Sequence, residues 1–333
     1  MTRLKTGVAL QGRYPPEVFE EMVGVIDAAR YDYLWLTDSS LHTRNPYVHL
    51  TLAARMTTRL HLGTAVTNPA TRHPGIVAVN AATLEELAPG RTILGIGAGD
   101  RPLETLGLRP ARLAELRASI DAIRRLLDGE HVDHKGPGFS MVDAHLRFDV
   151  AGSIPMFISA SGPKTLELAG EIADGVIFLG GLFRDGIEYG LEHIQHGADR
   201  AGRPRPHVAV FGYGAIDDGD PDGALDAARS IAAWFPQTAP YYCELAGLDP
   251  LVAAEVKARY AGGEFQEAKA AASILPKDFV RKMAFAGGSD QARDHLRTLA
   301  DLGVDSVHLF PLGAKRSESI MAFARVAAAL AQP

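Results

Sequence analysis

Cysteine is almost missing from this chain, and its scarcity excludes several kinds of site. The 333 residues include one cysteine, Cys243. A single thiol cannot form an intramolecular disulfide, and it cannot supply a cysteine-rich zinc or iron–sulfur cluster. This usage agrees with a reducing compartment.

Long apolar runs and clusters of basic residues are also missing. No apolar stretch reaches the roughly 18 residues that predict a transmembrane helix, and the N-terminus has no signal-peptide core. There are 34 Lys and Arg against 40 Asp and Glu, and no basic run marks a nucleic-acid surface. We therefore expect a soluble, cytoplasmic protein with no membrane or nucleic-acid partner.

What the sequence does contain is an alternation of short apolar strands with helix-length amphipathic segments. This alternation predicts a parallel sheet with crossover helices. Eight strand–helix units closing on themselves predict a (β/α)8 TIM barrel, and an open doubly wound sheet is the alternative topology. The predicted strands cover residues 4–10, 33–37, 60–66, 92–97, 155–159, 175–179, 207–213 and 306–310.

Helical patterns lie between these strands, and two stretches depart from the alternation of strands and helices. Residues 129–153 are rich in Gly, His and Asp without helical spacing. Residues 236–288 are mostly helical, with an Ala-rich helix around 264–273. We predict one barrel domain over residues 1–333 with these two insertions, and long barrel insertions often roof an active site. The predicted helices cover residues 16–29, 47–56, 74–87, 112–127, 164–172, 222–234 and 317–330.

In such a barrel the reactive residues follow the carboxyl ends of the strands. No G-x-S-x-G elbow and no H-E-x-x-H motif occurs, which argues against a serine hydrolase or a zinc peptidase. His193-x-x-His196, expected on a helix, and His131-x-x-His134, in the polar insertion, have metal-ligand spacing. Surface pairs are the favoured interpretation of both, so no metal is expected.

Small residues follow three of the strands. The run Gly95-Ile-Gly-Ala-Gly-Asp100 lacks the third glycine of a dinucleotide fingerprint, but it leaves room for a planar ligand. After the fifth strand, residues 159–164 form a loop that opens a helix with Lys164 in its first turn, and Gly180-Gly181 follows the sixth. Free backbone N–H groups at a helix start favour a phosphate, although an ordinary turn with Lys164 in solvent is the alternative.

These segments resemble one known family. The runs Gly63–Pro74, Ala82–Leu87, Leu94–Asp100, Ala160–Gly170 and Gly303–Val307 are similar to the luciferase-like family. Within it they resemble the branch of coenzyme F420-dependent methylenetetrahydromethanopterin reductase. The resemblance extends from the first strand to the last, outside the two insertions.

The resemblance implies a cofactor site at the barrel mouth. The third strand of the family ends in a bulge with a non-prolyl cis peptide against the flavin ring, which would be Ala65-Val66 here. Ala98 and Gly99 would line the ring. The phosphate would lie against two loops, which contribute Ala160, Ser161, Gly162, Lys164, Gly180 and Gly181.

The implied reaction is hydride transfer between the C5 carbon of a deazaflavin and a small organic substrate. Asp38 and His42 are the predicted proton donor or acceptor, although Asp38 would equally hydrogen-bond the ring or a neighbouring loop. Asn68, Arg72 and His73 are predicted to contact the cofactor head or to bind an anionic substrate, or Arg72 pins a loop through a buried ion pair. Relatives carry histidine directly after the residue matching Asp38, whereas this chain has Ser39, so their substrates do not follow.

Two other functions stay open at this point. A two-component FMN monooxygenase would share the barrel and its bulge, with FMN as cofactor and a separate flavin reductase as partner. A catalytically silent barrel that binds flavin would show no turnover. Barrels of this resemblance are often homodimers that pack through early helices.

Overall fold

Eight parallel strands close into a barrel in the computed structural model, which describes residues 4–260, 268 and 270–330. The order around the barrel is β1-β2-β3-β4-β7-β8-β9-β11, and pairing of β8 with β9 and of β11 with β1 closes it. The predicted TIM barrel is therefore confirmed, and the open sheet is excluded. The eight strands are β1 Lys5–Leu10, β2 Tyr33–Leu36, β3 His61–Thr64, β4 Thr92–Ile96, β7 Met156–Ala160, β8 Gly175–Phe178, β9 His207–Ile216 and β11 Ser306–Pro311.

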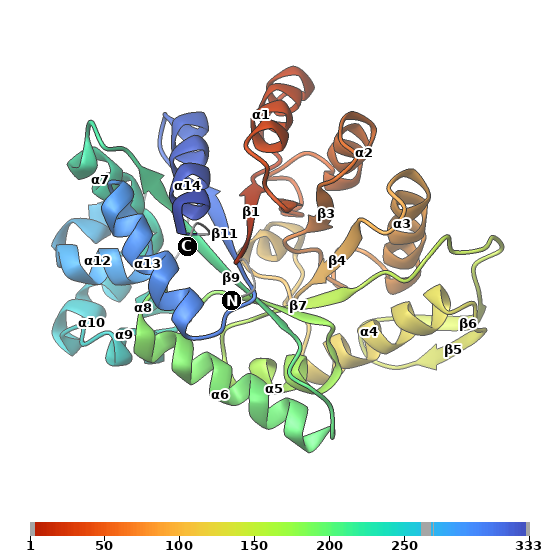
Figure 1. Ribbon diagram of the computed structural model, residues 1–333. Coiled ribbons are helices and arrows are strands. Elements are labelled where there is room, and N and C mark those ends of the chain that lie inside the picture. The colour runs from red at the N-terminus through yellow and green to blue at the C-terminus, as the bar shows by residue number, and fades with distance from the viewer. Residues whose placement is uncertain (1–3, 261–267, 269, 331–333) are drawn as a thin grey trace.

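Helices surround the strands (Figure 1). Proline at the first helical position begins several of them, because its fixed φ suits that position and its missing N–H would have no helical partner. Side-chain oxygens of Asn45 and Asp220 also cap two of these proline-initiated helices. The surrounding helices are α1 Pro16–Ala28, α2 Pro46–Met56, α3 Pro74–Leu87, α4 Leu113–Leu127, α5 Pro163–Ile172, α6 Arg184–Arg200, α7 Pro221–Ala232, α13 Ser289–Asp301 and α14 Arg316–Leu330.

The first predicted insertion contains an antiparallel hairpin of β5 Val132–Lys135 and β6 Ser140–Ala144. In Figure 1 this hairpin lies at the periphery beside α4. Strands of four and five residues with polar, exposed faces carry too little apolar alternation to be recognised in the sequence.

The second predicted insertion is helical, as expected, but it ends in a strand that we did not predict. Strand β10, Phe285–Gly287, pairs with the last residues of β9, where Gly214 lies opposite Phe285. Three residues are too few to show a period. The predicted Ala-rich helix at 264–273 lies largely outside the described residues. The helical elements here are α8 Trp234–Thr238, α9 Pro240–Leu245, α10 Pro250–Arg259, η2 Ala272–Ile274 and α12 Lys277–Met283.

Aromatic side chains fill the inside of the barrel. Trp35 is fully buried, and the rings of Phe157, Phe211 and His308 lie 5.7, 5.6 and 5.5 Å from it. These side chains come from alternate positions of their strands, which point inward. Together with Phe310 they form a plug below the carboxyl ends of the strands.

A chain of polar groups runs through this plug. The indole Nε1 of Trp35 donates to His308 Nδ1 at 3.0 Å, and His308 Nε2 lies 2.8 Å from Ser306 Oγ. Ser306 Oγ in turn lies 2.7 Å from His207 Nε2. The imidazoles of the buried His308 and the half-buried His207 therefore have hydrogen-bond partners while neutral. Among the described residues, no helix is long and apolar enough to cross a membrane.

Candidate active site at the barrel mouth

The predicted site residues lie on loops that leave the carboxyl ends of the barrel strands. Asp38 follows β2, Arg72 lies on the loop between β3 and α3, and Ser161 follows β7. Because parallel barrel strands end on one face, these loops share the barrel mouth. The structure then shows which of these side chains touch.

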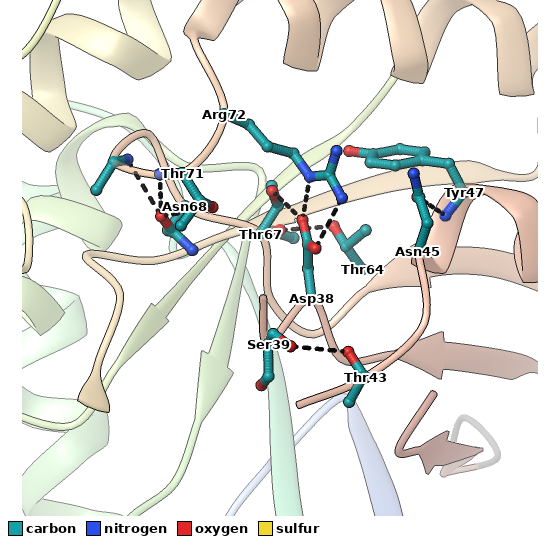
Figure 2. A network of polar contacts seen from close by, with 12 residues as sticks. Asp38, Ser39, Thr43, Asn45, Tyr47, Thr64, Thr67, Asn68, Thr71 and Arg72 are labelled. Atoms are coloured by element: carbon teal, nitrogen blue, oxygen red, sulfur yellow. Dashed lines mark hydrogen bonds and ion pairs between the residues drawn. The ribbon is translucent and has the colours of Figure 1, made fainter. Parts of the chain in front are cut away.

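Asp38 and Arg72 form a two-point ion pair across this mouth (Figure 2). Arg72 Nε donates to Asp38 Oδ2 at 2.5 Å, and Arg72 Nη2 donates to Oδ1 at 2.9 Å. The hydroxyl of Thr67 donates to Oδ2 at 2.8 Å. Only 3% of the Asp38 side chain and 20% of the Arg72 side chain are exposed. Three donors thus hold the carboxylate and join the loops after β2 and β3.

Tyr47 completes this polar network. The Arg72 guanidinium lies 5.4 Å from the centre of the Tyr47 ring, so the cation contacts an aromatic face as well as a carboxylate. Burial, and then the Asp38 charge, raise the pKa of the Tyr47 phenol. The hydrogen bond to Asp38 raises the pKa of Arg72. Sequence reasoning missed Tyr47 and the Thr67 donor, because both belong to the site only through loop geometry.

Asn68 uses its side-chain oxygen on its own loop. Its Oδ1 accepts from the backbone N–H groups of Ala70 and Thr71, at 3.1 and 2.9 Å, and from the Thr71 hydroxyl at 3.1 Å. Any contact with a cofactor therefore falls to the Asn68 amide nitrogen. That contact stays a prediction.

The peptide between Ala65 and Val66 is cis, as the family resemblance implied. Next to it, β4 approaches very closely: a Cβ at Gly95 would collide with the carbonyl oxygen of Thr64. Backbone bonds fix this approach, since Thr67 N–H donates to Gly95 O at 3.0 Å. Close packing of β4 against the end of β3 thus explains the glycine at position 95 without a bound nucleotide.

Small residues continue past the end of β4. Gly99 has φ of +89°, a left-handed conformation in which a side chain would be strained. A Cβ there would also meet Leu103 and lie 3.4 Å from Asn68. Ala98 and Gly99 thus form a small-residue wall at the end of β4, and its contact with a planar ring stays a prediction.

The two predicted phosphate loops contact each other and the second insertion. Ser161 Oγ donates to Leu179 O at 2.9 Å, and Tyr242 OH donates to Ser161 O at the same distance. Gly180 packs against the rings of Phe178 and Tyr242. Lys164 is exposed in the first turn of α5 and has its ammonium available to an anion. Tyr242 shows that residues from the predicted insertion help to hold this side of the mouth.

The two predicted histidines lie apart from the ion pair. His42 is partly exposed on the loop after β2. His73 caps α3: its Nδ1 accepts from Gly75 N at 3.2 Å, and its Nε2 lies 3.1 Å from Ser140 O on the β5–β6 hairpin. This engagement of both ring nitrogens favours a structural role for His73 over the predicted contact with substrate. The ion pair likewise favours loop pinning for Arg72.

A family model described as luciferase-like monooxygenase matches residues 4–306. The chain belongs to the luciferase-like family. The prediction from the sequence motifs is therefore confirmed at the level of the family. The cis peptide, the plugged barrel and the small-residue wall are thus features of a luciferase-like barrel in this chain.

Relatives of this luciferase-like chain include two enzymes and one solved structure. It is 32% identical over 295 residues to 5,10-methylenetetrahydromethanopterin reductase of Methanolobus tindarius, covering 87% of this chain and 89% of that one. It is 35% identical to F420-dependent glucose-6-phosphate dehydrogenase of Microbacterium testaceum, covering 64% and 66% of the two chains. The coenzyme F420 dependent tetrahydromethanopterin reductase structure from Methanopyrus kandleri matches with a TM-score of 0.86 and 27% identity, over 99% and 100% of the chains.

Proposed function

We propose that this chain is a coenzyme F420-dependent oxidoreductase that transfers a hydride to or from a small organic substrate. The observation that carries the proposal is the run of small residues Gly97, Ala98 and Gly99 after β4, where a Cβ at Gly97 would lie 2.9 Å from the Val66 side chain at the cis peptide. The relatives named as F420-dependent support the choice of cofactor. When bound, the deazaflavin supplies a ring carbon, C5, that accepts or donates the hydride.

The residues of the chain supply position and charge. The wall at Ala98 and Gly99 would take the ring, and the N-terminus of α5 with Lys164 would hold the phosphate. The pair of Asp38 and Arg72 fixes the loops after β2 and β3, and so the edge of the ring site. His42 lies outside this pair, which makes it the side chain that we favour for exchanging a proton with the substrate.

The first test is a fluorescence titration of the purified protein with F420 and, in parallel, with FMN. We expect micromolar affinity for F420 and negligible binding of FMN. Lys164→Ala should weaken F420 binding about tenfold, because a hydrogen bond to a charged group contributes about 1.5–3 kcal/mol. Lys135→Ala, which removes an exposed lysine from the peripheral hairpin, is the matched control and should bind F420 as the parent does.

Two results would redirect the assignment. Preferential FMN binding with oxygen uptake would replace it by the monooxygenase with a separate reductase. Tight binding of F420 without turnover of any tested substrate would favour the silent barrel. The cytoplasmic location inferred from the single cysteine stays a prediction.

We also propose that the chain forms a homodimer through α2 and α3. Both helices expose large apolar side chains, and an apolar patch on two neighbouring helices is typical of a subunit interface. Ile76 is 53% exposed on α3, and Val48 is 59% exposed on α2. The other members of this apolar surface are Met56, Val79 and Leu87.

Sedimentation equilibrium tests the dimer. The parent protein should sediment at twice the mass of the chain, and Ile76→Glu should sediment as a monomer because it would bury a charge at the interface. Leu251→Glu is the matched control: Leu251 is 79% exposed on α10, away from the proposed interface, so its substitution should leave the dimer intact. A monomeric parent would overturn the proposal.

A further inference from the structure

The peripheral hairpin brings together three side chains that bind metals in other proteins. His131 precedes β5, Asp143 lies near the end of β6, and His145 follows β6. One ligand atom from each lies within 4.8 Å of the others. The spacing in the sequence suggested His134 as the partner of His131, but that ring stacks on Phe139, 4.1 Å away. The hairpin register supplies His145 instead.

Hydrogen bonds around these residues set the tautomer of His145 and anchor the backbone of Asp143. His145 Nδ1 lies 3.2 Å from the Asp143 carbonyl oxygen, so it carries the proton and its Nε2 presents a lone pair. The Asp143 N–H donates to Asp133 Oδ1 at 2.9 Å, which anchors the backbone of the carboxylate residue. The hydrogen bond of His145 Nδ1 is a second-sphere contact, and such contacts fix the tautomer and orientation of histidines that bind metals.

The second feature of this cluster is the close contact between His131 and Asp143. His131 Nδ1 lies 2.6 Å from Asp143 Oδ1, and the rings of His131 and His145 stack with centres 4.0 Å apart. The Asp143 carboxyl thus has two imidazoles beside it.

We propose that His131, Asp143 and His145 form a surface site for one divalent transition-metal ion of the zinc class. Imidazole and carboxylate suit Zn²⁺, whose bonds to nitrogen and oxygen are about 2.0–2.2 Å. The stacked rings would have to turn about their side-chain torsions to reach one ion; His131 is exposed and His145 is half-buried. Water would fill the remaining position. The ion would bridge both strands at the rung where Val132 pairs with Ala144.

A second cluster offers the comparison that tests this assignment. Glu167, His193 and His196 also bring three ligand atoms together, between α5 and α6. There, however, Arg200 Nη1 lies 3.1 Å from Glu167 Oε2 and already neutralises the carboxylate. A cation fixed beside the carboxylate opposes a metal ion, so we assign no site to this cluster.

The experiment is a Zn²⁺ titration of tag-free protein in competition with a chromogenic chelator. We expect one ion per chain with micromolar affinity, and His145→Ala should weaken binding about tenfold or more. His196→Ala is the matched control and should bind as the parent does. Circular dichroism of each variant checks folding, and His131→Ala repeats the test at a second ligand.

Two outcomes would overturn the site. The parent would take up no Zn²⁺ at micromolar concentrations, or His145→Ala and His196→Ala would have equal effects on binding. The readout does not involve turnover, so failure here leaves the proposed F420-dependent activity untouched.

Discussion

Replacing Arg72 by alanine is expected to lower the free energy of unfolding by about 3–5 kcal/mol. The substitution removes two of the three donors to the Asp38 carboxylate and leaves only the Thr67 hydroxyl. Asp38 is buried, so its charge would stay in the protein without a partner. Equilibrium urea unfolding, followed by circular dichroism, measures the loss.

A double-mutant cycle separates this effect from lost packing. Asp38→Asn should cost less than Arg72→Ala, because Arg72 is 20% exposed and can reach water, whereas the Asp38 carboxylate cannot. In the double variant no buried charge remains, so we expect it to be more stable than Arg72→Ala alone by about 0.5–3 kcal/mol. Equal stability of these two variants would show that the ion pair is not what the arginine contributes.

Acid should destabilise the protein well before its carboxylates titrate. Burial lowers the pKa of the His207 imidazole to about 4; Asp305 opposes this shift, while Lys5 and Arg205 add to it. Burial, and then the His207 charge, lower the pKa of His308 as well. The unfolded chain therefore binds protons at a higher pH than the folded one.

These pKa values set the direction of the stability change and the pH range over which it occurs. The contribution of a neutral buried histidine is complete above the unfolded pKa of about 6.5, and it is lost as the pH falls through the folded pKa. His207 alone should cost about 3 kcal/mol between pH 6.5 and 4, at about 1.4 kcal/mol per pKa unit. Urea unfolding at a series of pH values measures this slope.

His207→Gln is the informative variant for this slope. Its amide can hydrogen-bond Ser306 but cannot gain a proton in this range. The variant should lose less stability than the parent between pH 6.5 and 4.5, above the pH at which most carboxylates of the unfolded chain titrate. Parallel curves for parent and variant would assign the acid effect to other groups.

The sequence predicted the barrel well because its signals are local. Apolar runs of five to seven residues marked all eight barrel strands, and proline in the first turn marked the starts of α1 and α3 within a residue. Strands β5, β6 and β10 were not predicted because short or half-exposed strands have no reliable apolar period. A strand of three residues, such as β10, exists only because β9 extends beyond its barrel neighbour.

The site was predicted only in part, because its contacts depend on how loops fold. The sequence placed Asp38 and Arg72 at the mouth, but it left open whether Arg72 binds substrate or pairs with a carboxylate 34 residues away. That choice depends on the loop after β3, which Asn68 shapes through its own backbone contacts. Likewise, the ring contact of His131 with His145 follows from the hairpin register, which spacing along the chain does not show.

The aromatic plug inside the barrel limits how ligands can reach and leave the site. Trp35, Phe157, Phe211 and Phe310 occupy the axis below the mouth, so the described part of the chain offers no passage from the opposite end. A cofactor and a substrate that meet at the mouth must enter and leave by the same opening. Whichever of them lies deeper has to bind first and leave last. The shape of the barrel thereby imposes an order of binding and release.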